Sequence, residues 1–127
     1  MKYLIDTHVI IWLAKDAHEL PKSIKGLIEN VENDIYISAA SLWEIAIKIN
    51  LRKLDLKLPL DKLLHDIRTS GFNVLQIEDN YLSKLLQLPY IHKDPFDRLL
   101  ISTALAEGLT VVTIDENIQK YDVPWIW

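Results

Sequence analysis

Four acidic side chains, Asp6, Glu44, Asp97 and Asp115, stand close to the points where the expected strands and helices meet loops. Three of them, Asp6, Asp97 and Asp115, belong to elements that adjoin short apolar stretches, where a partly buried carboxylate needs a partner. Carboxylates without a matching Cys or His cluster favour hard, oxygen-preferring cations such as Mg²⁺ or Mn²⁺. Such ions polarise a phosphodiester and activate water for in-line attack. Metal-assisted phosphodiester hydrolysis is therefore the chemistry that these residues indicate.

Ordinary helix chemistry offers a competing explanation for the first two acids. Asp6 directly precedes a helical pattern that begins at Thr7, so it is a candidate N-cap. Glu44 follows Ser41 by three residues, which is the spacing of a capping box. It also precedes Lys48 by four residues, the spacing of an ion pair on a helix surface, worth about 0.3 kcal/mol.

The stretch 92–117 carries the other two acids and is expected to form a helix, a tight turn and a buried strand. Asp94 precedes Pro95 and predicts an N-cap, while Asp97 in the first turn also complements the helix dipole. The helix is apolar on nearly all sides and ends near Gly108, which suits the left-handed C′ position. Residues 109–114 are expected to form an apolar, β-branched strand with Asp115 at its carboxyl end, although Asp115 also suits a cap of the turn 116–120.

The rest of the chain alternates between strand and helix patterns, which predicts a three-layer α/β fold with a parallel sheet and right-handed crossovers. Further strands are expected at 3–6, 35–38 and 73–77, an edge strand at 123–127, and helices at 7–14, 21–31, 39–51, 59–69 and 78–88.

Composition sets bounds on the whole molecule. A length of 127 residues suits one domain, 1–127, and half of the residues are hydrophobic. The chain has no cysteine, which excludes disulfides, thiolate metal sites and a cysteine nucleophile. Neither a signal peptide nor an apolar run of the roughly 18 residues that a membrane span needs is visible, so we expect a cytoplasmic protein without membrane contact. The net charge of −4 argues against broad nucleic-acid binding unless bound cations reverse the local sign.

Four segments in order resemble PIN-domain ribonucleases, and more narrowly the toxins of VapBC-type toxin–antitoxin pairs. These segments are YLIDTHVIIWL at residues 3–13, ISAASLWEIAIK at 37–48, HKDPFDRLLISTALAEGLTVVTID at 92–115, and a short C-terminal strand. The resemblance covers nearly the whole chain. It implies a sheet with the strand order 3-2-1-4-5 and an Mg²⁺-dependent endoribonuclease, with Mn²⁺ as an alternative ion. It also implies a cognate antitoxin and a homodimer.

The resemblance assigns the four acids to one metal site. Thr113 contributes a hydroxyl beside that site, and Thr7 and Asp94 are supporting residues. Asp94 belongs to the HxDPFDR variant of one branch of the family and is expected to act as a cap. His92 has two interpretations: it either only packs or faces solvent, or it contacts the metal site.

Basic and aromatic residues near Glu44 have two interpretations each. Lys48, Arg52 and Lys53 either form a solvated helix end or position RNA phosphates. Trp43, like Trp12, lies in an apolar helix face and is expected in the core or in an interface. With Ile47 and Leu51, Trp43 motivates the expectation of a dimer.

Two other functional classes stay open from the sequence. A phosphoryl-accepting regulatory domain also gathers acids at the ends of a parallel sheet, but it needs a lysine after a late strand, and none is well placed. In a pure interaction module, the acids would act only as caps and would not bind Mn²⁺ tightly.

Overall fold

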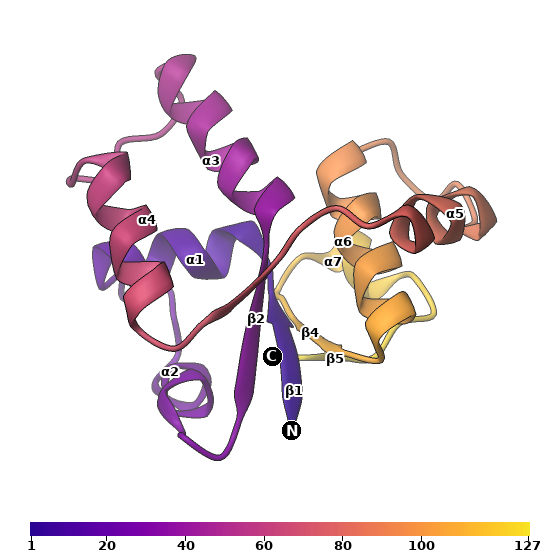
Figure 1. Ribbon diagram of the computed structural model, residues 1–127, viewed down its shortest axis with the longest axis horizontal. Helices are drawn as coiled ribbons and strands as arrows, with labels where there is room; N and C mark the ends of the chain where they lie inside the picture. The colour runs from indigo at the N-terminus through magenta and orange to yellow at the C-terminus, as the bar shows by residue number, and fades with distance from the viewer.

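The computed structural model describes residues 1–127 and contains five strands and seven helices (Figure 1). The strands are β1 Lys2–Ile5, β2 Asp34–Ser38, β3 Asn73–Leu75, β4 Thr110–Val112 and β5 Trp125–Ile126. The helices are α1 Thr7–Lys15, α2 Lys22–Glu29, α3 Ala39–Asn50, α4 Leu60–Thr69, α5 Asp79–Gln87, α6 Pro95–Glu107 and α7 Glu116–Gln119. None of these helices has the length and apolar character that crossing a membrane requires.

All strand pairs are parallel, and the order across the sheet is β3-β2-β1-β4-β5. This order confirms the one implied by the sequence resemblance. β1 is central, and its last residue Ile5 pairs with Val112 of β4. The register places Asp6 beside Thr113, immediately beyond the carboxyl ends of both strands. β5 lies at the edge, where Pro124 needs no donor and offers its carbonyl to the Val111 N–H.

Two apolar clusters sandwich the sheet and make the predicted three layers. Successive side chains of β1 point to opposite faces, so Tyr3 and Ile5 join one cluster and Leu4 joins the other. The larger cluster is covered by α1, α2, α3 and α4, and the smaller one by α6 and α7. Figure 1 shows α1, α2 and α4 on one side of the sheet and α5, α6 and α7 on the other. Helices therefore cover both faces of the sheet, and the side chains at its centre, Leu4, Ile5, Val111 and Val112, have no exposed surface.

Several elements are shorter than the sequence pattern predicts, and the edge strand expected at 123–127 spans only Trp125–Ile126. The helix expected at 21–31 begins after Pro21 and ends at Glu29, where the chain enters a turn. The strand expected at 73–77 ends at Leu75 because its pairing partner β2 ends at Ser38. The strand expected at 109–114 stops at Val112, and the following Thr113 turns its hydroxyl toward Asp6 instead of continuing the strand.

The caps confirm some predictions and correct one. Gly108 takes the left-handed conformation that ends α6. The predicted capping box between Ser41 and Glu44 is wrong, because α3 begins three residues earlier. Ser38 is the N-cap there, and its hydroxyl accepts a hydrogen bond from the Ala40 N–H. Glu44 therefore has no capping role and lies in the second turn of α3.

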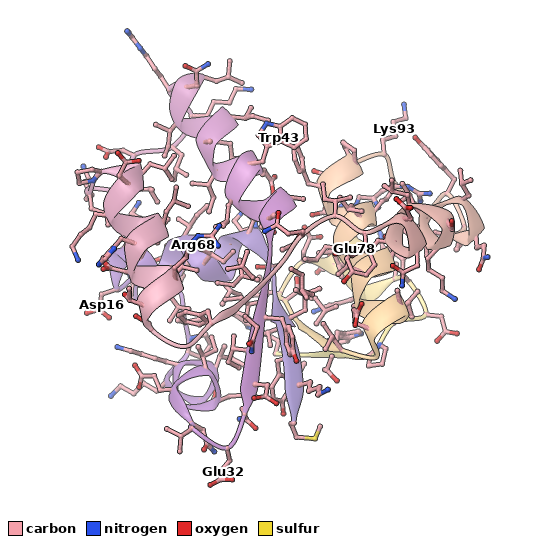
Figure 2. All side chains as sticks on the ribbon, viewed as in Figure 1. Asp16, Glu32, Trp43, Arg68, Glu78 and Lys93 are labelled. Atoms are coloured by element: carbon pink, nitrogen blue, oxygen red, sulfur yellow. The ribbon has the colours of Figure 1, made fainter.

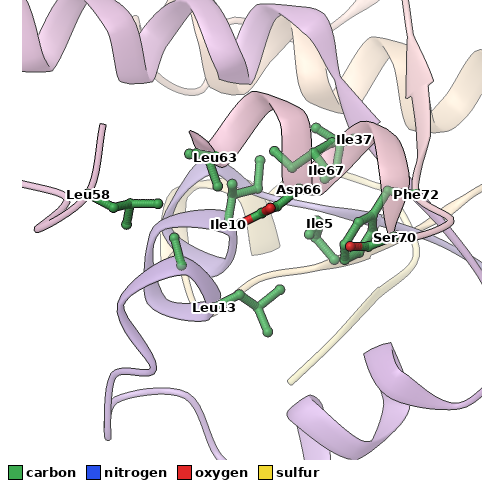
Figure 3. A pocket seen from close by; sticks show the side chains of 11 residues that line it. Ile5, Ile10, Leu13, Ile37, Leu58, Leu63, Asp66, Ile67, Ser70 and Phe72 are labelled. Atoms are coloured by element: carbon green, nitrogen blue, oxygen red, sulfur yellow. The ribbon is translucent and has the colours of Figure 1, made fainter. Parts of the chain in front are cut away.

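An apolar cavity of about 210 Å³ lies between α1, α4 and the sheet (Figure 3). Its lining includes Ile10, Leu63 and Phe72, and Asp66 is its only acidic residue. None of the four acids singled out in the sequence belongs to this lining. The candidate chemistry must therefore be sought at the carboxyl edge of the sheet.

Candidate active site

Asp6 is the most deeply buried of the four acids, with 3% of its surface exposed. Its Oδ1 accepts a hydrogen bond from the Val9 N–H at 2.9 Å, which makes Asp6 the N-cap of α1 as predicted. Its Oδ2 accepts a hydrogen bond from the Thr113 hydroxyl at 2.5 Å. Burial raises the pKa of this carboxyl, although the bonds from Thr113 and Val9 oppose the rise. Asp6 thus caps α1 and also lies where a nearby positive charge would stabilise its ionised carboxylate.

Thr113 connects Asp6 to Asp115. Its Oγ1 donates to Asp6 and accepts a hydrogen bond from the Asp115 N–H at 3.0 Å. Asp115 also caps α7, because its Oδ1 accepts from the Asn117 N–H at 2.8 Å. The implied hydroxyl at position 113 therefore lies between two of the acids, as the sequence resemblance led us to expect.

Asp97 lies in the first turn of α6, where burial raises the pKa of its carboxyl to about 6. The negative charges of Asp94 and Asp115 raise this pKa further, and a hydrogen bond with His92 opposes them. The charge of Asp115 also contributes to the raised pKa of Asp6, after burial. Asp115 therefore repels both Asp6 and Asp97 electrostatically at one edge of the sheet.

Glu44 is buried on α3 and is held from two sides. Its Oε1 accepts a hydrogen bond from the Thr7 hydroxyl at 2.6 Å, which connects α3 to the start of α1. Its Oε2 lies 3.3 Å from Lys48 Nζ, the ion pair that the four-residue spacing predicts. Since Thr7 directly follows Asp6, this contact places Glu44 next to the acid at the end of β1.

Asp94 is an N-cap, as predicted. Its Oδ1 accepts hydrogen bonds from the Phe96 and Asp97 N–H groups at 2.9 and 3.0 Å. Both donors are free at the start of a helix and need such a partner. Asp94 therefore secures the turn that carries Asp97.

Sequence reasoning missed a polar network behind Asp97. His92 Nε2 lies 3.0 Å from Asp97 Oδ2, and His92 Nδ1 lies 2.8 Å from the Tyr121 hydroxyl. Arg98, which is buried, donates to the same hydroxyl at 3.0 Å. The HxDPFDR motif contains His92 and Arg98 and could have indicated both residues. No local sequence pattern indicates Tyr121, which lies in the segment after α7.

The structure agrees with both interpretations of the basic run, and it excludes a core position for Trp43. Lys48 is engaged by Glu44, whereas Arg52 and Lys53 lie exposed in the loop after α3. A core position for Trp43 is wrong, since 61% of this residue is exposed. Figure 2 shows Trp43 on the side of α3 that faces α6, where its ring meets Phe96 edge-on at 5.4 Å. Trp12 is partly buried against the larger cluster and Trp127.

The donor chemistry of this edge fits a hard divalent cation. Its side-chain donors are carboxylate and hydroxyl oxygens, the ligands that Mg²⁺ and Mn²⁺ prefer. Burial is the main cause of the raised pKa values of Asp6 and Asp97, so a bound cation would offset part of the cost of ionising these carboxylates. In this structure, no group of three or more acidic or His side chains is arranged so that it could hold a metal ion, so the acids share one edge of the sheet without forming a complete site.

Comparison with known proteins gives a consistent result. Residues 3–124 match the family described as PIN domain. The curated protein Ribonuclease VapC22 of Mycobacterium tuberculosis is 27% identical over 126 residues, which cover 95% of this chain and 92% of that protein.

Solved structures share the fold at lower identity. The crystal structure of VapBC2 from Rickettsia felis, bound to a DNA fragment from its promoter, matches with a TM-score of 0.76 and 21% identity over 100% of this chain and 99% of that chain. DNA-bound VapBC from Salmonella typhimurium matches with a TM-score of 0.70 and 20% identity over 99% of this chain and 97% of that chain. The match over residues 3–124 and the shared architecture establish that the chain belongs to the PIN-domain family.

Proposed function

We propose that this protein is a divalent-metal-dependent endoribonuclease, with Mg²⁺ as its ion and Mn²⁺ as a substitute, and that it is the toxin of a toxin–antitoxin pair. The observation that carries the proposal is the gathering of acids at the carboxyl edge of the sheet, where Thr113 joins Asp6 to Asp115 and where burial and the charge of Asp115 raise the pKa of both Asp6 and Asp97. The similarity to a protein named as a ribonuclease supports the choice of RNA as substrate.

The residues of the chain divide the work of hydrolysis. A divalent ion, when bound, would polarise the scissile phosphate and lower the pKa of a water molecule. Asp6 and Asp97 are the principal ligands in this proposal, and Asp115 and Glu44 complete the negative edge. Thr113 occupies Oδ2 of Asp6 and so orients its carboxylate. Because the chain has no cysteine, we expect water rather than a cysteine to attack phosphorus.

We propose two protein partners as well. Several similar structures are VapBC complexes, which supports an antitoxin as the regulator. It would cover the acidic edge, the carboxyl edge of the sheet that carries Asp6, Asp97 and Asp115. A second copy of the chain is expected on the exposed apolar residues Trp43 and Leu51, both more than half exposed. A strictly monomeric light-scattering mass at high micromolar concentration would contradict the homodimer.

An alternative is a non-catalytic interaction module, and one observation favours it: Asp6, Asp94 and Asp115 all act as helix caps. The phosphoryl-acceptor alternative loses support, because the hydrogen-bond partners of Asp6 are Val9 and Thr113 and include no lysine.

The deciding experiment incubates the purified protein with single-stranded RNA, and with DNA of the same sequence, in Mg²⁺, in Mn²⁺ and in EDTA. We expect RNA cleavage with either metal and none in EDTA. In the same assay, Asp16→Asn is the matched control for Asp6→Asn, because Asp16 is an exposed acid whose only ion-pair partner is Lys25, at 3.2 Å. RNA cleavage that persists in EDTA would contradict metal dependence. A protein that cleaves RNA neither in Mg²⁺ nor in Mn²⁺ would favour the interaction module.

A further inference from the structure

His92 is almost enclosed between α6 and the segment that follows α7. Only 12% of its side chain is exposed, and its ring meets the Tyr121 ring edge-on at 5.4 Å. Both ring nitrogens have polar neighbours: Nε2 faces Asp97 Oδ2 at 3.0 Å, and Nδ1 faces the Tyr121 hydroxyl at 2.8 Å. Which nitrogen carries the hydrogen follows from what those neighbours can accept.

The Tyr121 hydroxyl fixes the hydrogen on one side. A phenol oxygen offers two lone pairs and one hydrogen. Arg98 Nη1 donates to this oxygen at 3.0 Å and the backbone N–H of His92 donates at 3.3 Å, so both lone pairs are in use. The remaining hydrogen of the hydroxyl has His92 Nδ1 as its acceptor at 2.8 Å. Nδ1 therefore carries no hydrogen.

The other side of the ring gives the same result. With Nδ1 as acceptor, the neutral ring carries its hydrogen on Nε2 and donates it to Asp97 Oδ2. The opposite tautomer would set the lone pair of Nε2 against a carboxylate oxygen and would place a third donor on the Tyr121 oxygen. Both contacts of the ring would be lost in that arrangement.

Arg98 holds this arrangement in place. Its Nη1 also donates to the Pro89 carbonyl at 2.9 Å, and its guanidinium lies 4.5 Å from the centre of the Tyr90 ring. These contacts tie the segment before His92 to the first turn of α6. The imidazole is thus fixed from the same helix that carries Asp97.

From this geometry we infer that His92 is a positioning residue: its Nε2–H, set by the Tyr121 hydroxyl, holds Oδ2 of Asp97 and leaves Oδ1 for a divalent cation. No protein donor hydrogen-bonds Oδ1 of Asp97, whereas Oδ2 is occupied by His92. The inference rests on the proposed role of Asp97 as a metal ligand. Residues that orient a ligand in this way commonly contribute 10- to 100-fold, in order of magnitude, to metal affinity.

The test measures Mn²⁺ binding by calorimetry on the full chain and on three variants. We expect His92→Phe to weaken binding by about 10- to 100-fold. His92→Gln, whose side-chain amide retains an N–H donor, should recover part of that loss. Asp97→Asn should abolish measurable binding at this site. A general packing defect at position 92 would not be repaired by Gln in preference to Phe.

A second readout leaves all of the proposed metal ligands unchanged. The ¹⁵N spectrum of the wild-type imidazoles should show His92 as the neutral tautomer with hydrogen on Nε2. Tyr121→Phe removes the hydroxyl and should convert this signal into a mixture of both tautomers.

The outcomes separate the two claims. The positioning role alone would be overturned if Nδ1 of wild-type His92 carried the hydrogen. It would also be overturned if His92→Phe bound Mn²⁺ as tightly as the wild type while Asp97→Asn had lost binding. Unchanged binding in Asp97→Asn would overturn this inference together with the proposed metal site.

Discussion

The two halves of the acidic edge are built in different ways. At the strand ends, Asp6 and Asp115 are both helix caps and share the hydroxyl of Thr113. At the start of α6, Asp97 is not a cap, and its carboxylate is held by His92, which is itself held by Tyr121. The first half is made by backbone turns and strand register, and the second half by side chains from separate segments. The strand-end half should therefore tolerate changes around it better than the helix-start half.

The largest expected effect comes from the strand-end half itself. Asp6→Asn keeps an oxygen for the Val9 N–H and thus preserves the cap, but it removes the negative charge. We expect RNA cleavage to fall by roughly 100-fold or more, the scale seen when one electrostatic contact to a reacting centre is lost. The prediction is tested by measuring the cleavage rates of this variant and of Asp16→Asn in Mg²⁺. Thermal melting curves show that both variants are folded. A folded Asp6→Asn protein with wild-type activity would show that Asp6 is only a cap.

The helix-start half should respond to pH when no metal is present. Burial raises the pKa of Asp97 in the folded protein to about 6, above its ordinary value of 3.8. Folding then favours the protonated form, so this group's contribution to stability declines as the pH rises from about 4 to about 6 and stays low above that range. Asp97→Asn removes this loss and should stabilise the metal-free protein at pH 7 but not at pH 4. Urea unfolding in EDTA at both pH values measures this, and destabilisation at pH 7 would contradict it.

The cap beside Asp97 should affect stability and spare the chemistry. Asp94 accepts two backbone N–H groups, so Asp94→Ala should lower the free energy of unfolding by about 1 kcal/mol. Cleavage under conditions where the variant is fully folded should stay near the wild-type rate. Asp94→Asn keeps the acceptor oxygen and serves as the control for charge. Loss of cleavage in both variants, with normal stability, would move Asp94 into the metal site.

These contrasts also explain what the sequence could and could not predict. The strand and helix order, the Asp94 cap and the Gly108 terminus follow from local patterns and are confirmed. The resemblance to PIN domains placed Thr113 beside Asp6, because neighbouring parallel strands end at the same edge. The position of Tyr121 could not be read in this way, since its contact with His92 joins segments 29 residues apart that share no periodic pattern.

The strand ends show the same limit. β3 stops where its partner stops, which is a property of register rather than of residues 76 and 77. Glu44 has the spacing of a capping box with Ser41, yet the helix begins at Ala39 because Ser38 supplies the cap. Local rules therefore identify which residues are able to cap, while the tertiary register decides which of them do.

The smallest expected effect concerns RNA approach. Replacing Lys48, Arg52 and Lys53 by Ala should weaken RNA binding and lower the slope of log affinity against log salt by about 2, or roughly 0.7 for each lost contact to single-stranded RNA. Lys48 also pairs with Glu44, so its removal frees an acid at the same time. Lys22→Ala on α2 is the control. Unchanged affinity and slope would show that these residues form only a solvated helix end.

Anomalous scattering from crystals grown with Mn²⁺ would show whether the acids of both halves bind a divalent metal at the carboxyl edge of the sheet. We predict one or two Mn²⁺ peaks there, with Asp6 and Asp97 as ligands from the two halves and with His92 on the other oxygen of Asp97. The Asp97→Asn protein, crystallised in the same way, should lose the peak or show it at much reduced occupancy. A Mn²⁺ ion bound elsewhere in a protein that cleaves RNA, or no ion at this edge in an active preparation, would contradict the account.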